Sequence, residues 1–510
     1  MADVDVSKNK HAAGAYDFLD CKDLHGRRMI KLSINPEEFF NNPKENIIKY
    51  ISEAIAIHDQ NVSEIQYLKN YKNGLQNILA KMRKDGSDIN NIEVVNYAYE
   101  FIQFKKGFTV GKPIKYIANG QDENNEKTYF DEYLKFINKE SLDLDKYEDI
   151  YTSGVAYTIC ISQKRDYDEE EEAPFIYKKL DNEKTFIAYA DDMLETELFS
   201  CYISSTKDSE GISRDTYTCY YDYKSLILRY GNNGYEIIQD ERAINIRQPI
   251  TEYCLNQDRI GVFEPVISQL NSFNTIRSNQ LDDIEQFINA FLVFVNQDPK
   301  FIMENIDKFR KKKAIALKSP NPQMAADVKL LQQQLDSAGV NETYENSKND
   351  VFAIVGVPMP TSNTGQGVSG EAQTYGGGWE NAQAVASVET TYIKKYERED
   401  LKKMLYLCKK DIKSKIKNLS VKNIDIKYTI NKSNNILVKA QAFKYFIDAG
   451  ATWEVGLELA NASDDSHLIG EQMEKHIEEK KMKEIDLEVY KNKLLSKVQK
   501  NEDSNEKASN

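Results

Sequence analysis

The spacing of apolar residues divides the chain into segments with different periods. From residue 36 to residue 104, apolar residues recur every three or four positions, which predicts several short helices. Between residues 112 and 248 the period shortens toward two, as expected for strands. Within that region, the Gly-Asn-Asn-Gly sequence from Gly231 to Gly234 predicts a hairpin turn. Together these patterns predict an α+β fold that is mainly α.

Two helical segments flank a basic one in the middle of the chain. Apolar residues at helical spacing predict a helix within residues 261–296, and this helix should end before Pro299 because proline disfavours helix in the residue before it. The same spacing predicts a second helix within residues 325–355. Residues 297–324 lie between them and end in Ser-Pro-Asn-Pro, which is typical of a turn. This connecting segment carries a basic run, Arg310, Lys311, Lys312 and Lys313.

A glycine-rich segment precedes the longest predicted helix. Residues 356–378 contain many glycines and prolines, which predicts a mobile loop. From Trp379 to Lys417 the helical spacing continues without Gly or Pro, so we expect a helix of about 55–60 Å at 1.5 Å per residue. The C-terminal part is predicted to hold a short strand and two helices, near residues 424–430, 436–449 and 469–498. Residues 1–35 are expected to form a flexible arm, and residues 499–510 a disordered tail.

Composition narrows the classes of function. A chain of 510 residues is expected to form more than one domain. Its net charge of -14 argues against a protein that binds nucleic-acid phosphates tightly. It is compatible with a protein along which DNA slides, because an acidic surface would disfavour adhesion of DNA. The six cysteines form no C-x-x-C pair, which indicates reduced, buried thiols in a reducing cytoplasm. The sequence holds no apolar run of the roughly 18 to 20 residues that a membrane span needs.

No motif in the sequence predicts catalysis. The segment from Gly107 to Pro113 differs from a phosphate-binding loop in glycine spacing, and Pro113 stands where Ser or Thr should bind magnesium, so a turn before a strand is expected. Ser369 lacks the G-x-S-x-G context of a nucleophile and is expected to cap a helix instead. The five histidines show no paired spacing and are expected at the surface. The acidic run from Asp168 to Glu172 predicts a solvated loop, with a metal site as the weaker alternative. We therefore expect no metal, no cofactor and no enzymatic activity.

The order of several short blocks resembles that of the portal proteins of tailed bacteriophages, of the siphophage type. The blocks extend from about Ile65 to Glu474, and their shared order is more specific than any one of them. They are Tyr71–Gly74 followed by Asn90-Asn-Ile, Phe108–Ile114, Leu281–Ala290, Ser369–Ala372 and Ala449–Leu457.

The resemblance implies a portal fold with wing, stem, clip and crown regions around an axial tunnel. By position, the wing would comprise residues 36–260, with a β-rich part at residues 112–248. The other regions would be the stem helices at 261–296 and 325–355, the clip at 297–324, the tunnel loop and the start of the long helix at 356–378, the long wing helix and a return strand at 379–432, and the crown at 433–498.

The resemblance also implies a function. Such a chain forms a homo-oligomeric ring, usually of twelve subunits, at the capsid vertex, where double-stranded DNA is packaged and ejected. The implied partners are the terminase large subunit, head-completion and adaptor proteins, and the major capsid and scaffolding proteins. The protein would reside in the virion, after assembly in the host cytoplasm.

Two groups of residues are the candidate site residues. The basic run Arg310–Lys313 would lie in the clip and dock acidic partner surfaces, with a solvated loop as the alternative. The tunnel-loop candidates carry no charge and offer DNA only neutral hydrogen bonds, which favours sliding over binding. They are Ser362, Asn363, Thr364, Gln366 and Ser369.

Two other classes of function remain open at this point. Another helical virion structural protein would share the long helices but would have no DNA channel, and its native mass would not be that of a large closed ring. A nuclease or an ATPase would show turnover with DNA or ATP and magnesium.

Overall fold

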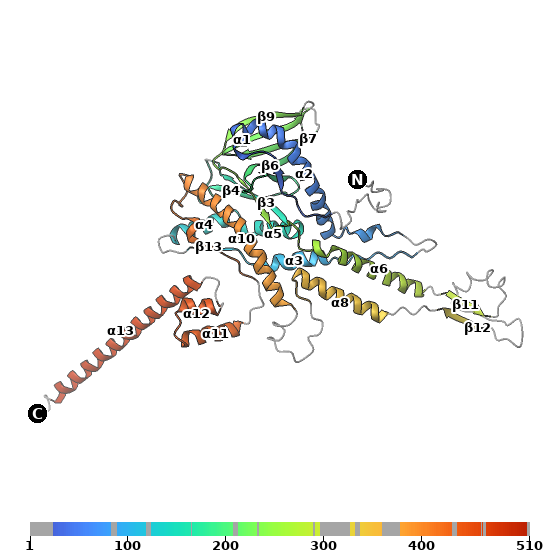
Figure 1. The fold of residues 1–510 in the computed structure, drawn as a ribbon. Coiled ribbons are helices and arrows are strands. Elements are labelled where there is room, and N and C mark those ends of the chain that lie inside the picture. The colour runs from blue at the N-terminus through green and yellow to red at the C-terminus, as the bar shows by residue number, and fades with distance from the viewer. Residues whose placement is uncertain are drawn as a thin grey trace. The chain divides into compact units, whose positions relative to one another are not determined.

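The computed structural model divides the chain into two compact units (Figure 1). The first unit contains residues 1–111 and 120–423, and the second contains residues 112–119 and 424–510. The residues that the structure describes are 24–82, 89–118, 124–164, 166–207, 213–231, 234–288, 291–295, 327–331, 337–359, 378–430, 436–460, 462 and 466–506.

A six-stranded sheet forms one part of the first unit. Its strands, in spatial order, are β1 (Ile30–Leu32), β5 (Thr185–Ala190), β6 (Glu197–Lys207), β7 (Ser213–Tyr221), β8 (Lys224–Gly231) and β9 (Gly234–Ala243). β1 runs parallel to β5, and the other neighbours are antiparallel. Tyrosine, threonine and isoleucine are frequent in these strands, as suits a pleated, half-buried surface. Gly231 pairs with Gly234, which confirms the predicted hairpin.

Two helices cover this sheet, α1 (Pro36–Asn41) and α2 (Pro43–Lys72). Proline begins each helix, where its missing N–H costs nothing, and the Asn35 side chain caps α1 by accepting from the Glu37 N–H. Phe39 stacks on Phe199 of β6 with a centroid distance of 6.1 Å. The prediction of several short helices was wrong for residues 43–72, which form one helix of 30 residues.

His58 on α2 corrects the expectation of surface histidines. Its side chain is buried, and Nε2 lies 3.0 Å from the carbonyl oxygen of Glu183. Burial lowers the pKa of His58. His25 and His476, in contrast, are exposed as predicted.

The predicted N-terminal arm is wrong for residues 24–35. Arg27, Ile30 and Leu32 are buried, and β1 adds to the sheet beside β5. A strand with apolar side chains facing α2 cannot leave the sheet without exposing them, so this segment belongs to the core.

A three-stranded sheet forms the second part of the first unit. Its strands, in spatial order, are β10 (Ile250–Cys254), β3 (Val155–Ser162) and β4 (Phe175–Leu180). The exposed turn between β3 and β4 holds the acidic run Asp168–Glu172, which confirms the solvated loop. Five cysteines are buried and free, as predicted: Cys160, Cys201, Cys219, Cys254 and Cys408.

In the described part of the first unit, four α-helices and three short 3-10 helices complete its body. They are η2 (Asn77–Ala80), α3 (Tyr97–Thr109), α4 (Asn124–Phe136), α5 (Lys139–Ser153), η3 (Glu264–Val266), α10 (Trp379–Lys410) and η4 (Val421–Asn423). The expectation of a β-rich segment was therefore wrong for α4 and α5, whose many charged residues favour helix over strand.

The middle of the chain forms a helix pair that carries a hairpin. Its elements are α6 (Ile267–Ile288), β11 (Phe291–Val295), β12 (Asp327–Leu331) and α8 (Ser337–Val355). The helices were predicted in the right order, but residues 291–295 and 327–331 are antiparallel strands rather than helix ends. The sequence Phe-Leu-Val-Phe-Val explains β11, because aromatic and β-branched residues favour strands.

α10 begins at the predicted residue but ends early. It contains 32 residues and stops at Lys410, where Asp411 adopts an extended backbone, instead of continuing to Lys417. At 1.5 Å per residue the helix is about 48 Å long.

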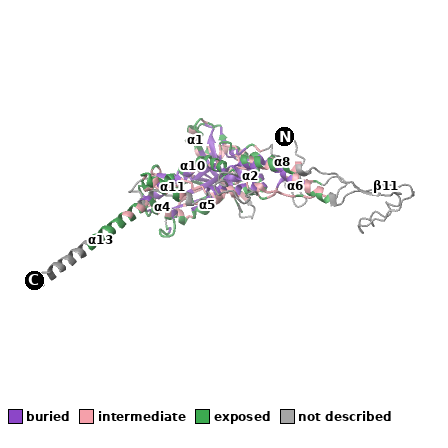
Figure 2. Ribbon diagram, turned by 90° about the horizontal axis from the view of Figure 1, so that it is seen from below, coloured by how far each residue is buried: buried purple, intermediate pink, exposed green. Residues whose placement is uncertain are grey.

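The second unit combines a small sheet with three helices. β2 (Lys115–Ala118) pairs antiparallel with β13 (Ile424–Lys427). The turn predicted at 107–113 is confirmed only after Thr109, because residues 107–109 end α3 and the chain bends at 110–112 before β2. The helices are α11 (Ile436–Asp448), α12 (Trp453–Leu459) and α13 (Ser466–Glu506). The predicted disordered tail is wrong for residues 499–506, which continue α13. Figure 2 shows that most side chains described on α13 are exposed.

Candidate functional site: the helix pair and its supports

The helix pair α6 and α8 is held together by aromatic and cationic contacts. Phe273 on α6 meets Tyr344 on α8 edge-on, with ring centroids 5.0 Å apart. The Arg277 guanidinium lies 5.0 Å from the centre of the same Tyr344 ring. Further along, the Gln280 amide donates to Asn341 at 3.1 Å. These contacts join two antiparallel helices that are far apart in sequence.

Helix α3 packs against the base of the helix pair, which is the end where α6 begins and α8 ends. The Tyr97 and Tyr344 hydroxyl groups are 3.2 Å apart, and Phe352 meets the edges of Tyr97 and Phe101 with centroid distances of 5.5 and 5.0 Å. Phe101 and Phe352 are fully buried. Edge-to-face aromatic clusters of this kind add stabilisation beyond the area they bury. They therefore hold α8 in a fixed position against α3.

A segment between η2 and α3 binds the outer part of α6. Asp282 accepts from Lys81 Nζ at 2.7 Å and from the Asn91 N–H at 2.6 Å. Burial opposes the charge of Asp282, but these two donors lower its pKa. Two turns earlier, Asn274 Oδ1 accepts from the Val95 N–H at 2.7 Å. These contacts hold α6 against the rest of the first unit at two positions that lie two turns apart.

A buried arginine fixes the chain just before α6. Arg27 pairs with Glu264 of η3 and with Glu64 of α2, where its Nη2 lies 3.0 Å from Oε2. It also donates to the Ser153 carbonyl at 3.1 Å. Both carboxylate side chains and the guanidinium are nearly inaccessible to solvent. The cluster joins four segments at the point where α6 begins.

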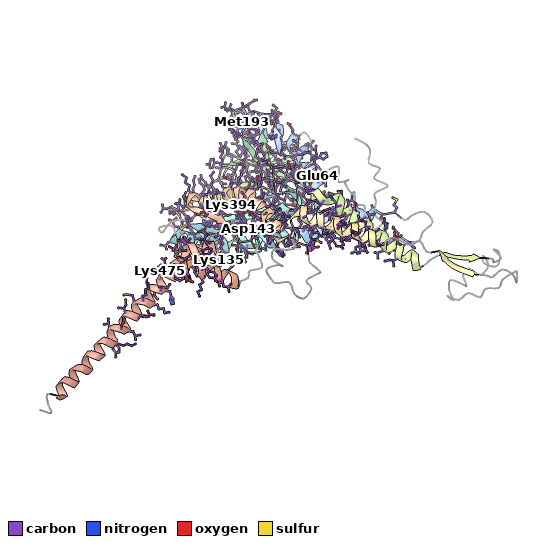
Figure 3. The ribbon with its side chains drawn as sticks, turned by 60° about the horizontal axis from the view of Figure 1, so that its bottom comes forward. Glu64, Lys135, Asp143, Met193, Lys394 and Lys475 are labelled. Atoms are coloured by element: carbon purple, nitrogen blue, oxygen red, sulfur yellow. The ribbon has the colours of Figure 1, made fainter. Side chains whose placement is uncertain are left out.

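A second buried ionic cluster lies between α5 and α10. Glu397 accepts from Lys139 at 2.6 Å and from Lys146 at 2.7 Å, and Asp143 contacts the same two lysines at 2.6 and 2.8 Å. Figure 3 labels Asp143 in the interior of the first unit. Burial alone would raise the pKa of Glu397, but its two lysine partners hold it well below its usual range. The charged form is therefore the stable one at neutral pH.

Asp400, one turn further along α10, extends this cluster to the three-stranded sheet. Its Oδ2 accepts from Tyr253 at 2.5 Å, from Thr158 at 2.7 Å and from Tyr177 at 2.8 Å. Burial and the neighbouring carboxylates raise the pKa of Tyr177 and Tyr253 well above the usual value, so both remain donors. Because one carboxylate oxygen receives hydroxyls from three strands, α10 is locked in register on the sheet.

A partly exposed ion-pair group joins α5 to α2 and α3. Glu148 accepts from Lys72 at 2.6 Å and from Lys106 at 2.8 Å. Burial opposes its charge, but the two lysines lower the pKa of Glu148 from 4.5 to about 2. The folded pKa lies below the ordinary value, so the stabilisation is present above about pH 4.5 and is lost as pH falls toward 2.

This pH window gives a testable prediction for Glu148→Gln. We expect the variant to melt at a lower temperature than the parent at pH 6, and the difference between the two to shrink as pH falls from 4.5 toward 2. Melting curves at a series of pH values would measure it. A difference that stays constant across that window would contradict the assignment.

An open cleft of about 530 Å³ lies near the C-terminal half of α10. Two pairs of exposed charges lie on its rim, with Arg247 Nε 3.8 Å from Asp222 and Lys402 Nζ 3.6 Å from Glu399. Lys403 is buried and donates to the Ile250 carbonyl at 2.8 Å. These charged groups are held by ion pairs or by a backbone oxygen, and none of these contacts is a nucleophile–base pair.

The residues predicted for the tunnel loop and the clip lie outside the described residues. Arg310–Lys313 belong to the chain between β11 and β12, and Ser362, Asn363, Thr364, Gln366 and Ser369 belong to the chain between α8 and α10. In the described ranges, no group of three or more His, Cys, Asp or Glu side chains is placed to hold a metal ion. No described helix is both long and apolar enough to cross a membrane.

The described polar clusters connect helices to one another and to the three-stranded sheet. A family model for phage portal proteins, SPP1 Gp6-like, matches residues 51–486. The chain belongs to this family of portal proteins, which are structural proteins of the phage capsid vertex. The resemblance seen in the sequence blocks is thereby confirmed. A search of curated proteins gave no match.

Proposed function

We propose that this chain forms a closed homo-oligomeric ring, usually of twelve subunits, which serves as the channel for DNA packaging and ejection. The family match over residues 51–486 carries the proposal. The rigid attachment of α6 and α8 supports it, because two helices fixed at their base can line a channel when copies are arranged around an axis. The net charge of -14 per chain would disfavour adhesion of DNA to the wall.

We assign the remaining regions by the same proposal. Residues 36–260 form the wing, 261–296 and 325–355 the stem, 297–324 the clip and 433–498 the crown. The clip would dock the terminase large subunit and head-completion proteins through Arg310–Lys313. If replacing all four by glutamine left binding of the terminase subunit unchanged, that docking role would be wrong. The uncharged residues of the tunnel loop would face passing DNA.

The ring itself can be tested with the purified full-length chain. We expect native mass spectrometry to give a species of about twelve chains, and negative-stain images down the axis to show a ring with a central hole. A monomer or dimer at high protein concentration would contradict the proposal. It would favour the alternative of a helical virion protein without a channel.

A further inference from the structure

A surface groove of about 180 Å³ lies where α8 ends, beside the first half of α10 and the chain that leads into α6. Gly356 follows α8 with a φ of +71°, and a Cβ built there would lie 2.9 Å from side-chain atoms of Val385. The Asn381 amide donates to the Ala353 carbonyl at 2.9 Å. The walls are thus closely packed and the groove is already formed in a single chain. Its lining residues are Leu255, Asn256, Ile260, Gly261, Val262, Pro265, Ile354, Val355, Val385, Val388, Glu389 and Tyr392.

Three large apolar side chains at this groove are exposed. Ile354 is 57% exposed, Val388 58% and Tyr392 45%. Single exposed apolar residues are common on protein surfaces, but a convergent set around a groove marks a site of interaction. Covering these side chains would remove apolar surface from water.

Charge is nearly absent from the groove. Glu389 is the one charged residue among those that line it. Along α10, only Glu380 and Glu389 are charged from Trp379 to Tyr392, whereas ten residues are charged from Ile393 to Lys410. Depletion of charge is typical of the centre of permanent interfaces between copies of one chain, while sites for transient partners are more polar.

The carboxylate of Glu389 is turned into the chain and does not charge the surface of the groove. Its Oε1 accepts from the buried Lys105 at 2.7 Å, but Oε2 has no hydrogen-bond partner in the described part of the chain. Burial raises the pKa of Glu389, as expected for a carboxylate with too few partners. Because both oxygens lie inside the single chain, the surface that fills the groove needs to bring only apolar side chains.

We propose that the groove receives an apolar segment of a neighbouring copy of this chain, which covers Ile354, Val388 and Tyr392. The inference rests on the proposed ring. In a ring, a surface on one copy meets a different surface on the next copy. One groove on each chain therefore provides one contact at every interface between neighbours. The apolar, charge-poor lining and the position beside the start of α6 favour a permanent self-contact over a transient partner.

Val388→Glu tests the proposal, because it places a charge in the groove at a side chain that the single chain leaves exposed. We expect the variant to stay folded and to fall from the ring mass to that of one chain, 58.7 kDa, in native mass spectrometry. The matched control is Ile412→Glu, at a residue that is 96% exposed and does not line the groove. It should assemble as the parent does, and circular dichroism should show both variants folded.

The outcomes separate this inference from the proposed function. If the parent forms rings and Val388→Glu forms them equally well, the groove is not the contact and the ring proposal stands. If the parent itself forms no ring, the proposed function fails. Should Val388→Glu not fold, Val388→Cys with a thiol-to-amine cross-linker gives an independent test. We expect a covalent product of two chains there, and much less of it from Ile412→Cys; equal yields from both would overturn the inference.

Discussion

Replacing Glu397 by glutamine is expected to lower the free energy of unfolding by about 3–5 kcal/mol, the usual effect of removing one partner from a buried ion pair. The carboxylate is 1% exposed and accepts from Lys139 and Lys146, which are 6% and 1% exposed. Glutamine keeps the shape but not the charge, so two buried ammonium groups would share Asp143 alone. That shortage of negative charge is the reason for the large expected loss.

Chemical denaturation followed by circular dichroism, at one fixed protein concentration, would measure this loss. Glu399→Gln is the matched control two residues away on α10. Glu399 is 51% exposed and its contact with Lys402 is 3.6 Å long, so we expect a change within about 0.5 kcal/mol. If both variants lost the same small amount, the buried cluster would not hold α10 as we argue.

Local sequence signals predicted those elements that depend on neighbouring residues. The hairpin at Gly231–Gly234 follows from turn residues between alternating strands. The start of α10 at Trp379 follows from the end of the glycine-rich segment, and the loop at Asp168–Glu172 follows from like charges that need water. In each case the deciding interactions lie within a few residues.

The errors occurred where distant residues decide the structure. The apolar run of β11 suits a helix or a strand, and its pairing with β12, more than thirty residues later, selects the strand. β1 looked like part of a loose arm because only three residues form it, and the β5 residues that pair with it lie 158 positions later. Single-chain periodicity contains no information about such partners.

The buried ionic cluster between α5 and α10 was also beyond prediction. Lys139, Asp143 and Lys146 resemble an ordinary charged helix face, and only the fold places Glu397, 258 residues after Lys139, against them. Nothing in the local sequence of α5 indicates this distant partner. The family, in contrast, could be predicted, because it depends on the order of short blocks along the chain.

Arg27→Ala is expected to cost about 3–5 kcal/mol as well, although the residue lies in a segment that the sequence suggested was flexible. The variant removes the cation that Glu64 and Glu264 share, and it removes the bond to the Ser153 carbonyl. Burial already raises the pKa of Glu264 above its ordinary value, against the effect of Arg27. Without Arg27 this pKa should rise further, and the carboxyl should bind a proton on folding.

The bound proton makes the loss of stability in Arg27→Ala depend on pH. A raised folded pKa makes folding less favourable as pH increases through it, so the deficit of Arg27→Ala should be larger at pH 8 than at pH 5. Denaturation curves of parent and variant at both pH values would measure it. Lys31→Ala is the control on the same segment, because Lys31 is 39% exposed and its partner Glu195 50% exposed, and its effect should stay within about 0.5 kcal/mol. A deficit for Arg27→Ala as small as that of the control would mean that residues 24–35 do not fix the chain before α6.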